Sequence, residues 1–168
     1  MRRVLVFGLT LLTAVLLQTT VFAQLKILGV SPDLLLAVVI SFALLEGPSA
    51  GAVLGFAGGF LRDLLLDAPA GLTGLSYLVI GYVVGSIRPY IGSNTVFVPA
   101  AGVFLGSIAA TGLYEVLQGL FGQRPAPVSR AISVVLLTGV YNTILVPFIY
   151  PPVRRIAAFY KPEKVYQW

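Results

Sequence analysis

Several charged side chains in this sequence stand in or beside apolar stretches, where a charge is by default a functional hypothesis. Arg62 and Asp63 are adjacent, Asp67 follows one helical turn later, and Asp33 and Glu115 lie in other apolar regions. A carboxylate pair such as Asp63 and Asp67 can act as general acid and base, but we expect both at the end of one helix without a partner on a facing helix. The sequence contains no histidine and no cysteine, which removes the usual general base, the commonest metal ligand and thiolate chemistry. We therefore expect no catalytic residue, no metal site, no cofactor and no enzyme activity.

The composition identifies the environment of these charges. Hydrophobic residues make up 58% of the 168 residues and charged residues only 10%, whereas soluble domains carry about 25% charged residues. The sequence therefore predicts an integral membrane protein, and its length suits one polytopic membrane domain over residues 1–168. The net charge of +5 does not indicate nucleic-acid binding, because the basic residues gather near the ends instead of forming a stripe.

Apolar runs predict an all-α fold, a single bundle of six transmembrane helices. The second helix is expected to begin at a capping Ser31 with Pro32 in its first turn, and Pro151 and Pro152 are expected to close the sixth. The second helix is short for a bilayer core of about 30 Å, and five spans would remain if it formed a re-entrant pair with the third. The predicted helices cover about residues 4–22, 31–46, 48–66, 72–88, 96–121 and 129–150.

Basic residues set the expected orientation, because they collect on the cytoplasmic side of membrane proteins. With six spans both termini share one side, so we expect both to be cytoplasmic. The first apolar stretch also resembles a secretory signal, and cleavage after Ala23 would leave five spans. Seven of the eleven basic residues fall on the predicted cytoplasmic side: Arg2, Arg3, Arg88, Arg154, Arg155, Lys161 and Lys164.

Under this orientation an outer polar cluster lies in the outer third of the membrane, formed by Asp33, Arg62, Asp63 and Glu115. The cluster can line a pocket open to the outside or contact a partner. Alternatively it is structural, with Arg62 paired to an acid inside the fold or reaching the headgroups. Two uncharged polar residues, Gln18 and Asn142, are expected to hydrogen-bond neighbouring helices.

Glycines recur at every fourth position at the start of the third helix, at Gly47, Gly51, Gly55 and Gly59. This spacing leaves a strip without side chains along one face, which allows close approach of another helix in lipid. We therefore predict a packing interface at Gly51, Gly55 and Gly59, against a helix of the same chain or of a partner protein.

The same segment resembles a known family. Its residues, in order, are Pro32-Asp33-Leu34-Leu35, then Gly51, Gly55 and Gly59, then Asp63-Leu64-Leu65, and Gly71-Leu72. This order resembles the rod shape-determining protein MreD family over about residues 31–75, and the later helices match in hydrophobic layout. Arg62 departs from the pattern, which has an uncharged residue there, and can neutralise Asp63.

The resemblance implies a non-enzymatic component of the bacterial cell-elongation machinery in the inner membrane. It implies binding to MreC and, through MreC, a link to the MreB cytoskeleton and the RodA–PBP2 peptidoglycan synthase. It also implies a six-helix bundle similar to the substrate-binding subunits of energy-coupling factor transporters. The first hypothesis is therefore a membrane scaffold that helps to maintain rod shape and to organise peptidoglycan synthesis.

The alternative is a substrate-binding subunit of a small-solute, vitamin-type transporter, with the outer polar cluster as its pocket. Such transporter subunits resemble one another in a strip of small residues on the first helix, which docks a coupling protein. In this sequence Ala14 is followed by Gln18, without such a strip. The first helix therefore favours the scaffold hypothesis.

Overall fold

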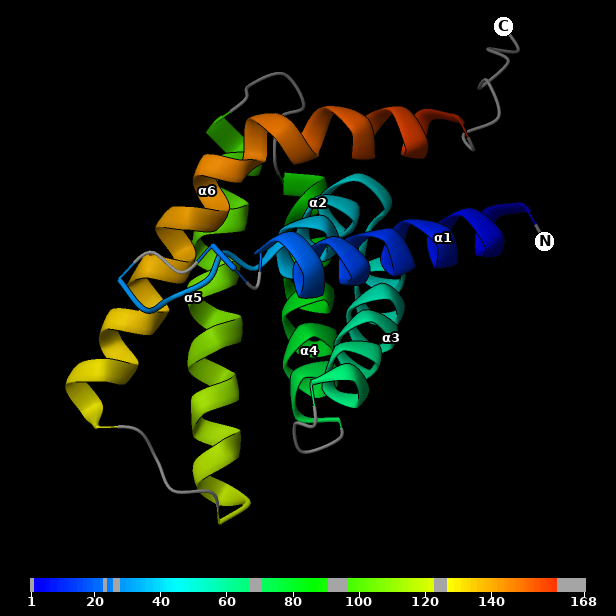
Figure 1. The fold of residues 1–168 in the computed structure, drawn as a ribbon. Coiled ribbons are helices and arrows are strands. Elements are labelled where there is room, and N and C mark those ends of the chain that lie inside the picture. Colours follow the sequence, from blue (N-terminus) through cyan, green and yellow to red (C-terminus); the bar gives the residue numbers. More distant parts are fainter. Residues whose placement is uncertain are drawn as a thin grey trace, which may run out of the picture.

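The computed structural model of the chain describes residues 2–22, 24–25, 28–66, 71–90, 97–122 and 127–159. Figure 1 shows that these residues form a helical bundle. A π-helical turn at Gln18–Phe22 continues α1, and a 3-10 turn at Arg88–Tyr90 follows α4. The six α-helices are α1 (Arg2–Leu17), α2 (Leu34–Glu46), α3 (Pro48–Leu65), α4 (Leu72–Ile87), α5 (Phe97–Leu120) and α6 (Val128–Phe159).

The helices confirm the predicted class of fold, an all-α membrane bundle. By length and composition, three segments of the described chain can cross a membrane: Leu5–Phe22, Phe97–Leu120 and Val128–Phe159. The helices α2 and α4 are apolar but shorter. The number of helices that cross the bilayer stays a prediction.

The second helix, α2, is the centre of the fold. Every residue from Leu34 to Ala43 is buried, and α2 contacts α1, α3, α4, α5 and α6. A helix that is covered on all sides is apolar all round, which explains why every residue of α2 from Leu34 to Ala43 except Ser41 is hydrophobic. Its 13 residues rise only about 20 Å, so α2 begins inside the bundle.

A tight turn joins α2 to α3. Gly47 has a φ of +99°, a conformation that residues with a side chain rarely adopt. Its amide donates a hydrogen bond to the carbonyl of Ala43 at 2.9 Å, which closes α2. Pro48 then occupies the first turn of α3, where its missing N–H costs nothing. The turn sends α3 back beside α2 and toward its close neighbour α4.

The last helix is longer than the sequence predicted. It runs to Phe159, so the prediction that Pro151 and Pro152 close it near residue 150 is wrong. Prolines inside a helix remove backbone hydrogen bonds and bend it, and Figure 1 shows the end of α6 turning to run across the top of the bundle. The helix continues past the bend because Val153 and Ala157 are buried there.

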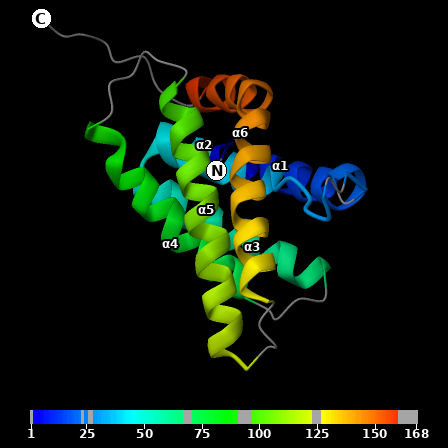
Figure 2. The same cartoon turned by 90° about the vertical axis from the view of Figure 1, so that its left-hand side faces the viewer.

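The first helix also lies across the bundle. In Figures 1 and 2, α1 runs crosswise to α5, and it contacts α2 and α3. The end of α6 has a similar crosswise direction in Figure 1. A groove therefore remains between α1 and the end of α6, with part of α2 at its base.

Candidate functional site

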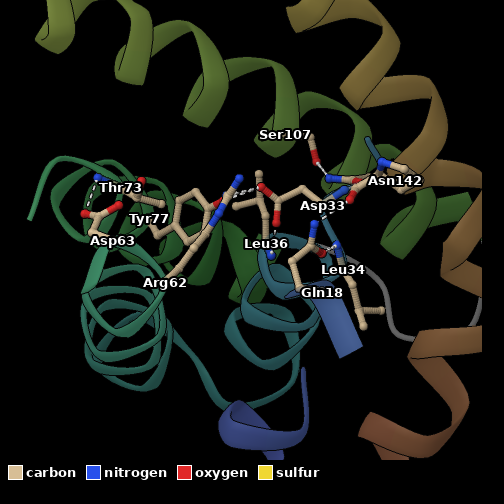
Figure 3. A network of polar contacts seen from close by, with 11 residues as sticks. Gln18, Asp33, Leu34, Leu36, Arg62, Asp63, Thr73, Tyr77, Ser107 and Asn142 are labelled. Carbon is tan, nitrogen blue, oxygen red and sulfur yellow. Dashed lines mark hydrogen bonds and ion pairs between the residues drawn. The ribbon is translucent and has the colours of Figure 1, made fainter. Parts of the chain in front are cut away.

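Asp33 is the centre of a polar network at the buried start of α2 (Figure 3). Its Oδ1 atom accepts a hydrogen bond from the Leu36 amide at 3.0 Å, so Asp33 caps α2. The expected cap at Ser31 is therefore wrong, and the helix starts after Asp33. The Oδ2 atom accepts a hydrogen bond from Arg62 Nη1 at 2.5 Å and another from the Tyr77 hydroxyl. Arg62 Nη1 also donates to that hydroxyl oxygen.

Gln18 ties the π-helical end of α1 to this point. Its Nε2 atom donates to the Pro32 carbonyl at 2.8 Å, and its Oε1 atom accepts from the Leu34 amide at 2.7 Å. Both groups of the amide side chain are therefore used on the segment that leads into α2. The two hydrogen bonds fix α1 against the start of α2.

Asn142 makes the corresponding connection from α6. Its Oδ1 atom accepts from the Asp33 amide at 2.7 Å, and its Nδ2 atom donates to the Ser107 hydroxyl on α5 at 2.8 Å. The Asn142 side chain is fully buried. One amide therefore joins the start of α2 to α5 and α6.

The polar network supplies hydrogen-bond partners for the backbone amides at the start of α2. The first amide groups of a helix have no partner within the helix, and unpaired amides are costly where neither water nor lipid can accept their hydrogen bonds. At α2 the amides of Asp33, Leu34 and Leu36 are each paired with a side chain. The polar network, made of Gln18, Asp33, Arg62, Tyr77, Ser107 and Asn142, thus allows α2 to begin inside an apolar bundle.

Asp63 has a separate structural role from that of Arg62. Its Oδ2 atom accepts hydrogen bonds from the Gly71 amide at 2.9 Å and the Thr73 amide at 3.0 Å. These amides lie at the first turn of α4, so Asp63 acts as a cap supplied by the end of α3. Arg62 is adjacent in sequence but forms its ion pair with Asp33. The sequence suggested that Arg62 neutralises Asp63. In the structure Arg62 pairs with Asp33 instead, and Asp63 binds backbone amides at the start of α4.

The structure brings only part of the outer polar cluster together. Asp33 and Arg62 are in contact, and Asp63 lies at the other end of the group in Figure 3. Glu115 is half-buried on α5, and among the described residues it has no ion pair with Arg62. Asp67 lies outside the described residues.

The glycine strip of α3 packs against α4 of the same chain. A Cβ atom added at Gly51 would lie closer than 3.0 Å to the carbonyl of Gly81, and one at Gly55 would be as close to the carbonyl of Tyr77. One added at Gly59 would lie 2.7 Å from backbone atoms of α4. Real Cβ atoms essentially never come this near, so a side chain at these positions requires the two helices to separate.

The strip and the polar network meet at Tyr77, which the sequence interpretation missed. The backbone of Tyr77 packs on Gly55, while its hydroxyl group donates to Asp33. Its spacing could have revealed this role. Tyr77 stands four residues before Gly81 and eight before Gly85, so it lies on the face of α4 that packs on α3. Close packing of α3 on α4 therefore places the tyrosine within reach of Asp33.

The arrangement holds helices together and leaves little capacity for chemistry. The Asp33 carboxylate accepts three hydrogen bonds and faces a guanidinium group, so it is engaged and not available as a base. Among the described residues no group of three potential metal-ligating side chains comes together. The contacts point to a structural role for the polar network.

Replacing Asn142 with leucine should destabilise the protein. The change keeps a similar side-chain volume but leaves the Asp33 amide and the Ser107 hydroxyl without this partner, which costs about 1–3 kcal/mol for each buried group. Unfolding in mixed micelles with increasing SDS measures the loss. Thr143→Val is the matched control, because within the described part of the chain the Thr143 hydroxyl donates only to the Gly139 carbonyl of its own helix. Equal stabilities of the two variants would contradict the role assigned to Asn142.

Comparison with models of protein families gives a match. The family model of the rod shape-determining protein MreD matches residues 1–156, nearly the whole chain. Searches of curated proteins and of solved structures found no match, so the implied similarity to transporter subunits stays a prediction. Together with the apolar helices, the family match shows that this membrane protein belongs to the MreD family and has a role in rod shape determination.

Proposed function

We propose that the protein is a non-enzymatic scaffold of the cell-elongation machinery, which binds MreC and helps to organise peptidoglycan synthesis. Through MreC it would be linked to the MreB cytoskeleton and to the RodA–PBP2 synthase. The observation that carries this proposal is the family match over residues 1–156. The use of Asp33, Arg62 and Asp63 in contacts that hold helices together supports it further.

The same contacts weigh against the transporter alternative. A pocket for a polar solute needs a few polar groups directed at the ligand. Here Gln18 and Asn142 bind the start of α2, and Arg62 binds Asp33 and Tyr77. These side chains are used within the fold. To recognise a solute through these residues, a binding subunit would have to break these bonds.

We also propose that the single domain, residues 1–168, lies in the bacterial inner membrane with both termini in the cytoplasm. The arrangement of basic residues supports this orientation. Arg88 follows α4, and Arg154 and Arg155 lie near the end of α6. Figures 1 and 2 show these two helix ends at one end of the bundle, opposite the start of α6. Basic residues gathered at one end favour a cytoplasmic position for that end.

The proposal is tested by purifying the tagged chain from its native membrane after photo-crosslinking. A crosslinking residue is placed at exposed positions on three helices, Phe56 on α3, Leu105 on α5 and Ile144 on α6, with the buried Leu35 as the control. We expect MreC to be captured from at least one exposed position and not from Leu35. Recovery of vitamin-loaded protein with an ATPase module, and without MreC, would overturn the scaffold proposal.

A further inference from the structure

The groove between α1 and the end of α6 has a volume of about 530 Å³. This lies in the range of small-molecule sites, roughly 300–1,000 Å³. Leu17 contributes to the α1 wall, Val38 to the base on α2, and Phe148, Val153 and Ile156 to the α6 wall. Figure 1 shows the two helical segments that form its walls, the crosswise helix α1 and the crosswise end of α6.

The lining of the groove suits hydrocarbon. Its hydroxyl groups belong to Thr10 and Thr13, and both donate their hydrogen within α1, to the carbonyls of Val6 and Leu9 at 2.8 Å. These hydroxyls are therefore already paired as donors. The remaining lining is aliphatic or aromatic, so a polar solute would lose its hydration here without replacement.

The shape of the groove favours a flexible chain over a transmembrane helix. Close helix packing in membranes uses small residues on both surfaces. The α1 wall of the groove has such residues, Thr10, Thr13 and Ala14, but the α6 wall does not. The α6 wall of the groove consists of bulky residues such as Phe148, Ile149 and Ile156, and no glycine lies among the described lining residues. An acyl chain can follow these irregular walls, whereas a rigid helix cannot approach them closely.

A positive charge stands at the edge of the groove. Arg155 is exposed and lies three residues after the lining residue Pro152, so the two side chains are neighbours on the helix surface. Arg154 is also exposed, but its spacing of two residues from both Pro152 and Ile156 places it away from the groove. A basic side chain beside an apolar groove matches the two parts of an anionic phospholipid.

We propose that this groove binds an anionic phospholipid, with an acyl chain between α1 and α6 and the phosphate group beside Arg155. The bound lipid completes the apolar contact between these two helices, which the protein itself leaves open. Binding selects anionic lipids through the headgroup and retains them through the acyl chain.

The test uses the full chain in vesicles that contain spin-labelled phosphatidylglycerol or spin-labelled phosphatidylcholine, with the immobilised fraction read by electron paramagnetic resonance. We expect phosphatidylglycerol to be immobilised preferentially. Arg155→Gln should lower this preference about fivefold, the factor expected for one basic side chain at an anionic membrane surface. Arg154→Gln should lower it much less, because Arg154 faces away from the groove.

A second pair of variants tests the groove itself. Thr13→Trp fills the groove from an exposed lining position, whereas Leu12→Trp adds the same bulk to α1 at an exposed position outside the lining. Only Thr13→Trp should remove the immobilised phosphatidylglycerol, with helix content unchanged by circular dichroism. Equal binding of the two lipids, equal effects of the two arginine variants, or retained binding in Thr13→Trp would each overturn the proposal. So would capture of the MreC transmembrane helix by a crosslinker at Thr13, because the groove would then be a protein interface.

Discussion

Replacing Arg62 with methionine should destabilise the protein by about 3 kcal/mol. This is the lower end of the cost of breaking a buried ion pair, because the Arg62 side chain is 26% exposed. The change keeps an apolar stem of similar length but removes the cation that faces Asp33 Oδ2 at 2.5 Å. The carboxylate then stays inside the bundle without its counter-charge, since the Asp33 side chain is only 10% exposed. Unfolding in mixed micelles with increasing SDS measures the loss.

The matched control is Arg130→Met, which removes an exposed arginine at the start of α6. Exposed substitutions of this kind usually change stability by less than about 0.5 kcal/mol. Equal destabilisation by Arg62→Met and Arg130→Met would show that the ion pair contributes nothing particular.

A double-mutant cycle separates the ion pair from the other contacts of Arg62. In the variant that combines Arg62→Met with Asp33→Asn, no uncompensated charge remains, so the combined loss should be smaller than the sum of the single losses. The asparagine can still cap α2 through its side-chain oxygen. A strictly additive result would mean that Asp33 and Arg62 stabilise the fold independently, in contradiction to the geometry of Figure 3.

The sequence was sufficient to predict the order of the six helices and the boundaries of some of them, because these depend on local properties of the chain. Long apolar runs and the Gly47-Pro48 turn placed the boundaries of α3 and α5 within one residue of those observed, Pro48–Leu65 and Phe97–Leu120. The glycine spacing likewise indicated a face for close packing. These patterns involve residues within one or two helical turns, so they can be recognised in the sequence before the fold is known.

The partners of the polar side chains could not be predicted in the same way. Arg62 is 29 residues from Asp33, and Asn142 is 109 residues from it. Only the packed bundle brings them together. Arg62 stands next to Asp63 in the sequence, yet the helix geometry turns it toward Asp33, because adjacent residues on a helix do not face one another.

At the end of α6, packing outweighs the tendency of proline to end a helix. Proline disfavours the interior of a helix, which led to the prediction of an end at Pro151. Past the bend, Val153 and Ala157 are buried, so their packing against neighbouring helices stabilises this segment. The burial of this segment depends on the helices that α6 contacts, α2 and α5, so the sequence of α6 alone does not reveal it.

Replacing Gly55 with alanine should be among the most damaging single changes in the chain, although it adds only one methyl group. That methyl group would overlap the Tyr77 carbonyl and would lie 3.0 Å from the Leu78 amide nitrogen. Backbone atoms cannot rotate out of the way as side chains do, so α4 has to move as a whole. Overpacking of this kind costs about 1–3 kcal/mol and occasionally more. The movement also pulls the Tyr77 hydroxyl away from Asp33, so we expect a loss of at least about 3 kcal/mol in the same unfolding measurement.

Two other glycines in the same chain supply the controls for Gly55→Ala. Among the described residues, the atoms nearest to a Cβ atom at Gly58 belong to the side chains of Leu11 and Leu35, both at 3.1 Å, and a Cβ atom at Gly112 has no neighbour within 4 Å. Gly58→Ala should therefore cost less than Gly55→Ala, because leucine side chains can shift. Gly112→Ala should be neutral or stabilising by up to about 1 kcal/mol, since alanine favours a helix interior over glycine. If the three substitutions had equal effects, helix propensity and not the contact between α3 and α4 would explain them, and the glycine strip would have no particular role in positioning Tyr77.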